Sequence, residues 1–118
     1  MLYLYGKFKN AFQFAWNGFK YAYKTQWAFK VELFIFIVAI PLSIYFYQTT
    51  AELILMMGSV IFLLMMELIN SAIEVTINRI GMEQHPLSGL AKDLGSAVMV
   101  VAGLNVVMTF GIICIFNM

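Results

Sequence analysis

Three long apolar stretches leave this chain few ways to fold. The stretch at residues 53–66 reads LILMMGSVIFLLMM and contains no charged residue. Hydrophobic residues make up 63% of the 118 residues and charged residues 11%, whereas a soluble domain keeps about a quarter of its residues charged. About twenty apolar residues cross a bilayer as a helix, and lipid offers the backbone no other hydrogen-bond partners. The sequence therefore predicts an all-α integral membrane protein.

We expect a single domain, residues 1–118, with three transmembrane helices and an N-terminal amphipathic surface helix. In the surface helix, Phe8, Phe12 and Phe19 recur at helical spacing, while lysines occupy the other faces. The expected bounds are about 6–24 for the surface helix and about 31–48, 53–77 and 94–117 for the spans.

Lysine and arginine are distributed unevenly about these spans. Five lysines precede the first span, and Arg79 and Lys92 lie in the connection between the second and the third. The connection between the first two spans has neither residue type. The positive-inside rule therefore predicts that the N-terminus and the second connection are cytoplasmic. The net charge of +1 argues against nucleic acid as a partner.

Several polar residues interrupt the second span, in and just after the sequence ELINSAIE. At about 100° per residue, four of them share one helix face within about 60° of Glu67: Asn70, Ser71, Glu74 and Asn78. Glu67 also lies roughly 18 Å before Arg79 along a helix, which is inside the membrane. A charged group at the centre of a membrane helix costs about 2.5–3.5 kcal/mol. This polar face therefore needs a partner or a function.

Two explanations of the polar face stay open at this point. Hydrogen bonds between helices would account for Asn70 and Ser71. The two glutamates fit that explanation poorly, because each needs its own partner and the spans contain no lysine or arginine. A metal ion or a substrate hydroxyl would partner them instead.

Further polar groups gather in the second connection, near the cytoplasmic end of the polar face: Glu83, Gln84, His85, Lys92 and Asp93. Pro86 is expected to end the segment before it, and Ser88 is the expected cap of the third span. The chain has no Walker A loop, no dinucleotide glycine motif and no CxxC pair. Phosphate chemistry at this end would therefore not use a soluble nucleotide fold.

The polar face and the second connection belong to two segments, ELINSAIE with the following RIG (residues 67–81) and HPLSGLAKDLGSA (residues 85–97). These segments resemble the small prokaryotic integral-membrane diacylglycerol kinases, a family that includes undecaprenol kinase. The length, the three spans and the surface helix are similar as well. The resemblance implies phosphoryl transfer from ATP to a membrane lipid alcohol, with Mg²⁺ as cofactor. It also implies a homotrimer in the bacterial inner membrane.

The resemblance implies a role for each matched residue. Glu67 resembles the general base that takes the proton of the lipid hydroxyl, and Glu74 resembles a carboxylate that holds magnesium. Glu67 and Ser96 lie where the family binds its lipid substrate. The implied nucleotide-binding residues are Lys7, Phe14, Asn70, Glu74, Glu83, Gln84, His85, Lys92 and Asp93.

Gln26 is the second implied metal ligand, although the family pattern has a glutamate at that position. A neutral amide keeps an oxygen ligand but lacks the charge that helps to bind a hard cation. Glu32, six residues later, is expected about 240° round the helix and therefore not to replace it. Asn78 also stands where the family usually has aspartate. Nearer the N-terminus, Lys7 and Phe14 stand in place of an arginine and a tyrosine.

The lipid substrate stays open between two alcohols. The segment LSGLAKDLGSA is closer to diacylglycerol kinases of Gram-negative type than to undecaprenol kinases, so diacylglycerol is the expected substrate and phosphatidic acid the product. A small proton-coupled membrane exporter is the alternative from another class, because it too is short and uses a membrane glutamate. Such exporters usually have four spans and place that glutamate in the first.

Overall fold

The computed structural model describes all residues, 1–118, and contains four helices and no strand. They are α1 (Leu2–Thr25), α2 (Trp27–Phe46), α3 (Thr50–Ile80) and α4 (Pro86–Phe116). The last three are each long and apolar enough to cross a membrane. The predicted all-α class, with three membrane helices and a further helix at the N-terminus, is therefore confirmed.

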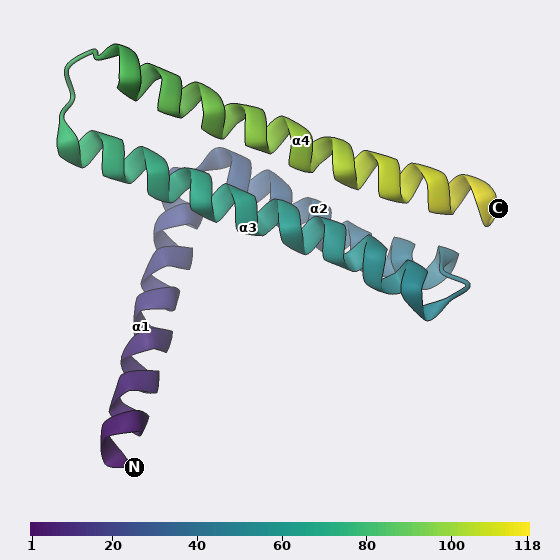
Figure 1. Ribbon diagram of the computed structural model, residues 1–118. Coiled ribbons are helices and arrows are strands. Elements are labelled where there is room, and N and C mark those ends of the chain that lie inside the picture. The colour runs from purple at the N-terminus through teal and green to yellow at the C-terminus, as the bar shows by residue number, and fades with distance from the viewer.

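α3 is the central helix of the bundle. It packs against both α2 and α4, while α1 leaves the bundle at its junction with α2 (Figure 1). The molecule measures 51 × 47 × 21 Å, so its thinnest dimension holds about two layers of helices at their usual spacing of about 8–10 Å. Only 15 of the 118 residues are buried. Most of each membrane helix is therefore available to lipid or to another protein chain.

The core is a narrow stripe along one face of α3. Met56, Val60 and Leu63 recur at spacings of three and four residues and are buried. The neighbouring helices bury small residues, among them Ala39 of α2 and Ala102 of α4. Small side chains let membrane helices approach closely, and this close approach holds the bundle together where lipid supplies no hydrophobic driving force.

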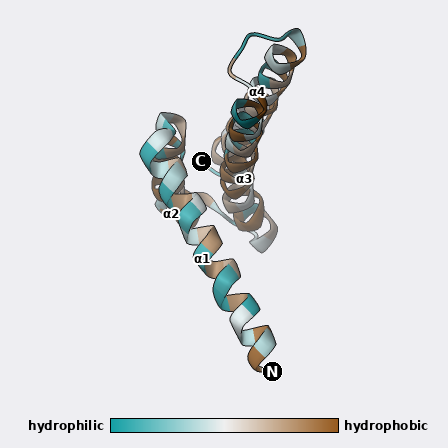
Figure 2. Cartoon of the chain, turned by 90° about the vertical axis from the view of Figure 1, so that its left-hand side faces the viewer, coloured by the Kyte–Doolittle hydropathy of each residue, from teal (hydrophilic) through white to brown (hydrophobic).

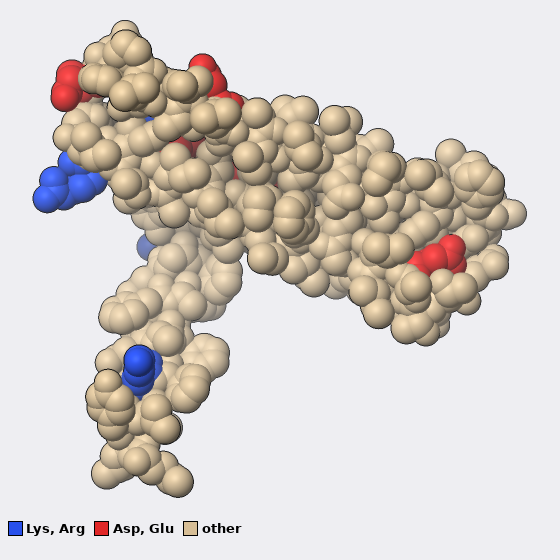
Figure 3. All heavy atoms as spheres, in the orientation of Figure 1, with Lys and Arg blue, Asp and Glu red and all other residues tan.

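Polar and charged residues lie mainly at one end of the bundle and along α1. Figure 2 shows hydrophobic residues over most of α3 and α4, and hydrophilic residues mixed with hydrophobic ones along α1. In Figure 3 the charged side chains cluster around the α3–α4 connection and on α1, with one acidic group at the far end of the bundle. The charge asymmetry of the sequence is therefore also an asymmetry in space. The orientation that it predicts in the membrane stays a prediction.

The start of α4 differs from the expected one. α4 begins at Pro86, and its cap is His85, whose Nδ1 accepts a hydrogen bond from the Leu87 N–H at 3.1 Å. Ser88, the expected cap, lies inside the first turn. Proline is favoured at the first position of a helix because its missing N–H would have no partner there. The helix can therefore begin earlier than the serine rule predicted.

The opposite end of the bundle is held by one polar cluster. Thr49 and Glu52 form a capping box at the start of α3: Thr49 Oγ1 accepts from the Glu52 N–H at 3.2 Å, and Glu52 Oε1 accepts from the Thr49 N–H at 3.0 Å. Asn117, just after α4, donates from Nδ2 to the Phe46 carbonyl at 2.8 Å and to Glu52 Oε2 at 3.1 Å. This side chain therefore joins the ends of α2, α3 and α4.

We predict that Asn117→Ala lowers the thermal midpoint of unfolding. The bond to the Phe46 carbonyl alone contributes about 0.5–1.5 kcal/mol. Thermal unfolding in detergent of Asn117→Ala, Glu52→Gln and the double variant measures the effect. Because both side chains belong to one cluster, the double variant should lose less stability than the sum of the two single variants. Additive losses would show that the two residues act independently.

Candidate functional site

The polar face of α3 continues its buried stripe. Glu67 is 4% exposed, and Ser71 is buried with no hydrogen-bond partner for its Oγ. Asn70 and Glu74 are half-buried, and Asn78 near the end of the helix is exposed. The face therefore runs from the protein interior to the surface at the α3–α4 connection.

Glu67 has two acidic neighbours on this face of the bundle. Its carboxylate lies close enough to that of Glu32 on α2, and to that of Glu74 on α3, for the charges to interact. Glu32 is itself buried, and its Oε2 has no hydrogen-bond partner. The sequence pattern alone does not predict that Glu32 lies near Glu67. Its one signal in the sequence is a carboxylate at the start of an apolar span, without the further polar residues that share a helix face with Glu67.

Glu32 was expected to lie on another face because the rotation was counted from Gln26. Gln26 lies between α1 and α2, and its backbone (φ −108°, ψ 103°) is extended rather than helical. Its N–H donates to the Ala22 carbonyl at 2.9 Å, and its carbonyl accepts from the Phe29 N–H at 3.1 Å. The helical count therefore holds from Trp27 onward but not at Gln26 itself, and the expectation that Glu32 does not replace Gln26 stays a prediction. The Gln26 side chain is half-buried.

Asn70 is the contact of the polar face with α4. It lies so close to Gly95 that a side chain on that glycine would collide with the Asn70 Oδ1. Gly95 is buried. The protein gives the Asn70 side chain no hydrogen bond. Its amide therefore keeps unused hydrogen-bonding capacity on the polar face.

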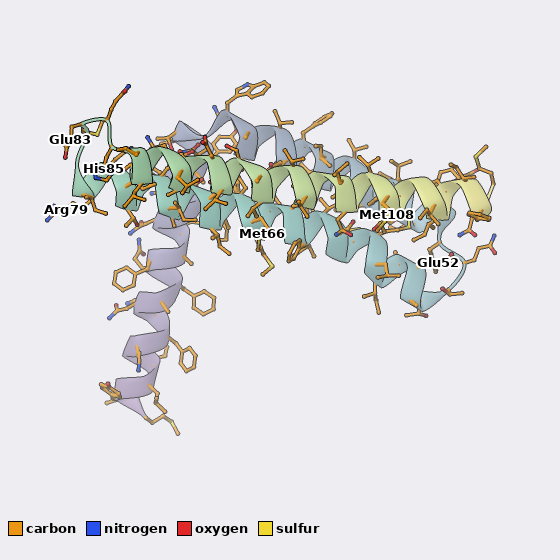
Figure 4. All side chains as sticks on the ribbon, turned by 45° about the horizontal axis from the view of Figure 1, so that its top comes forward. Glu52, Met66, Arg79, Glu83, His85 and Met108 are labelled. Atoms are coloured by element: carbon orange, nitrogen blue, oxygen red, sulfur yellow. The ribbon has the colours of Figure 1, made fainter.

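A polar cavity of about 700 Å³ lies at the α3–α4 connection. Its polar lining residues are Asn78, Glu83, Gln84, His85, Ser88 and Lys92. The cavity is at the same end of the bundle as Arg79 and opposite to Glu52 (Figure 4). A cavity of this size with both acidic and basic groups can hold a charged, water-soluble ligand.

The structure brings together only some of the implied site residues. Glu83, Gln84, His85 and Lys92 line the cavity, whereas Glu67, Asn70 and Glu74 lie on the polar face that leads to it. Asp93 and Ser96 are exposed on α4, outside that lining. Lys7 and Phe14 are exposed on α1, which projects away from the bundle (Figure 1). Within one chain, these two residues are not part of the cavity.

An apolar groove of about 390 Å³ lies between α1, α2 and α3. Its lining residues are Trp16, Phe19, Lys20, Tyr23, Lys24, Phe29, Leu33, Leu64 and Leu68. Leu68 directly follows Glu67 in the chain, so the groove ends close to the polar face. The sequence alone does not predict this groove. Its one signal in the sequence is the alternation of aromatic residues and lysines in α1, which indicates a surface helix but not a groove.

The residues of the polar face fit a magnesium ion only together with a ligand. No group of three or more acidic, histidine or cysteine side chains gathers in the chain to hold a metal ion. Magnesium at nucleotide sites is held by one or two carboxylates together with phosphate oxygens and water. The half-buried Glu74 accepts no hydrogen bond from the protein. It is therefore free to contribute one carboxylate to such a site.

Known proteins of one kind match the chain along most of its length. The sequence model of the family described as prokaryotic diacylglycerol kinase matches residues 13–114. The diacylglycerol kinase of Haemophilus influenzae is 41% identical over 107 residues, which cover 91% of each chain. That of Pseudomonas aeruginosa is 36% identical over 104 residues, covering 88% of this chain and 85% of the relative. That of Escherichia coli is 34% identical over 100 residues, covering 85% of this chain and 82% of the relative.

Proposed function

Because this chain belongs to the prokaryotic diacylglycerol kinase family, and is therefore a lipid kinase of a bacterial membrane, we propose that it phosphorylates diacylglycerol with ATP to give phosphatidic acid. One observation carries the proposal: the polar face around Glu67 lies inside a membrane helix and leads to the polar cavity at the α3–α4 connection. A lipid hydroxyl in the membrane and a nucleotide in the cytoplasm can meet along such a face.

The lipid hydroxyl oxygen attacks the γ-phosphorus of ATP in the proposed reaction. A new O–P bond forms, the bond between the γ-phosphorus and the bridging oxygen breaks, and ADP leaves. The hydroxyl proton passes to the Glu67 carboxylate, which acts as the general base. The place of Glu67 inside a membrane helix, on the polar face that leads to the cavity, supports this role, because the substrate hydroxyl belongs to a lipid that stays in the membrane.

The nucleotide is proposed to bind in the cavity at the α3–α4 connection. The Lys92 ammonium group attracts the phosphates, and Glu83, Gln84 and His85 contact the rest of the nucleotide. Asn70 and Glu74 complete the site from the polar face. Glu74 and Gln26 would hold the Mg²⁺ of MgATP, which neutralises charge on the transferred phosphoryl group.

The acyl chains of the lipid are proposed to lie in the apolar groove between α1, α2 and α3. The aromatic and leucine side chains there match acyl chains in polarity, and the lining includes Leu68, which follows Glu67 in α3. Ser96, exposed on α4, contacts the headgroup in this proposal. The two lysines of the groove suit the water-facing side of a lipid layer, where long basic side chains extend toward the headgroups.

Undecaprenol is the second candidate substrate, since the resemblance extends to undecaprenol kinases. The three relatives compared above are all named diacylglycerol kinase, which favours diacylglycerol. The exporter alternative is not supported, because the family and the relatives that match are kinases.

A homotrimer in the inner membrane, with a cytoplasmic N-terminus, completes the proposal. Lys7 and Phe14 lie on the projecting helix α1, away from the cavity of their own chain. A second copy would allow α1 of one chain to approach the cavity of another. The large unburied surface of α2, α3 and α4 supports assembly, because three helices alone enclose little.

We predict that Glu67→Gln lowers turnover by about 10²–10⁴-fold and leaves nucleotide binding nearly unchanged, because it removes a base and no phosphate contact. Phosphate transfer from ATP to diacylglycerol in detergent micelles, with nucleotide binding measured separately, tests this. Glu52→Gln makes the same change at the far end of the bundle and should keep its turnover. Near-normal turnover by Glu67→Gln would exclude it as the base.

Lys92→Ala should raise the ATP concentration for half-maximal activity by about tenfold, since it removes a charge-assisted contact to phosphate. The matched control is Lys9→Ala, an exposed lysine of α1 that lines neither the cavity nor the groove. An unchanged ATP titration for Lys92→Ala would place the nucleotide site elsewhere.

Gln26→Glu should lower the magnesium concentration for half-maximal activity, because a second charged ligand strengthens binding of a hard cation. The gain should disappear in Gln26→Glu combined with Glu74→Ala, since both residues act on one ion. A magnesium titration of the wild type and the variants measures this. If Gln26→Glu leaves the magnesium dependence unchanged, Gln26 is not a ligand position.

A further inference from the structure

Gly95 is the one glycine of the helices that a side chain from a neighbouring helix touches. A Cβ at this position would collide with the Oδ1 of Asn70 on α3. At Gly58 on α3, and at Gly89, Gly103 and Gly111 on α4, an added Cβ would meet no such atom within 4 Å. The missing side chain therefore matters for the packing of the bundle at Gly95 and at none of these other positions.

The contact fixes which side of the Asn70 amide faces α4. A backbone Cα–H group carries a partial positive charge and attracts a carbonyl oxygen, so the amide oxygen is the favoured group beside Gly95. The amide NH₂ group is then directed away from the α4 backbone. It has no hydrogen-bond partner in the protein. The two N–H donors are therefore free for a ligand.

We propose that Gly95 is a positioning residue for phosphoryl transfer: its missing side chain lets the Asn70 oxygen rest against α4, so that the Asn70 N–H donors are presented to the nucleotide phosphates. The inference rests on the proposed function, in which Asn70 contacts the nucleotide. Gly95 itself touches no substrate in this account. It acts through the orientation of one amide, and α4 supplies a rigid backbone that holds that orientation.

Gly95→Ala tests the proposal because it adds a single methyl group where the Asn70 oxygen lies. The amide must turn or α4 must move, and a displacement of about 1 Å in a catalytic site can cost on the order of a hundredfold in rate. We expect kcat to fall between about tenfold and a hundredfold on this basis. In Asn70→Ala, too, both kcat and the KM for ATP are measured. The ratio of the change in kcat to the change in KM should be the same in the two variants. Gly103→Ala and Gly111→Ala, where the methyl group meets open space, should behave like the wild type.

The double variant Gly95→Ala with Asn70→Ala separates positioning from simple packing. The collision should lower the thermal midpoint of unfolding in Gly95→Ala. The double variant lacks the amide and therefore the collision, so its midpoint should rise again above that of Gly95→Ala. The kcat of the double variant should stay at the value of Asn70→Ala, because the amide is absent in both. The double variant also keeps the proposal testable if Gly95→Ala alone does not fold.

Three results would overturn the proposal. The first is a wild-type kcat for Gly95→Ala. The second is a double variant whose kcat lies below that of Asn70→Ala by the same fold-decrease that Gly95→Ala causes in the wild type. The two substitutions would then act independently. The third is near-normal turnover by Asn70→Ala, which would also remove Asn70 from the proposed nucleotide site. Only this third result also bears on the proposed function. A failure of the Gly95 proposal alone can therefore be distinguished from a failure of the proposed nucleotide site.

Discussion

Glu67 lies in a membrane helix, although lipid solvates a carboxyl group very poorly. Its side chain is accordingly buried in the protein, with 4% of it exposed. Only protein can surround such a group at that depth, and α3 provides this by occupying the centre of the bundle. The same arrangement sets Glu32 of α2 near Glu67 and brings Gly95 of α4 against Asn70. A lipid kinase needs a polar site of this kind, because its substrate hydroxyl belongs to a molecule that stays in the membrane.

The two ends of the bundle differ in what their polar residues do. At the end opposite the cavity, Asn117 and Glu52 form hydrogen bonds that join α2, α3 and α4. At the α3–α4 connection the polar residues line a cavity, and the side chains of Glu83, Gln84 and Lys92 form no hydrogen bond within the chain. Satisfied polar groups stabilise a structure, whereas unpaired groups in a cavity are available for a ligand. The cavity end is therefore the proposed place of phosphoryl transfer.

The helices and the main polar face could be predicted from the sequence, because apolar length and helical periodicity determine them directly. Contacts between helices could not. The rotation counted from Gln26 to Glu32 assumed an unbroken helix, and the extended backbone at Gln26 removes that assumption. The contact between Gly95 and Asn70 likewise could not be predicted from the sequence, because it depends on how closely α3 and α4 approach each other. His85 replaced Ser88 as the cap of α4 because Pro86 can occupy the first helical position.

We propose above all that this chain transfers phosphate from ATP to diacylglycerol at the membrane. The most direct test incubates the purified protein with MgATP and a lipid extract containing both diacylglycerol and undecaprenol, and identifies the phosphorylated product by mass spectrometry. We expect phosphatidic acid that forms only when ATP is present. Undecaprenyl phosphate as the main product, or no phosphorylated lipid at all, would contradict it.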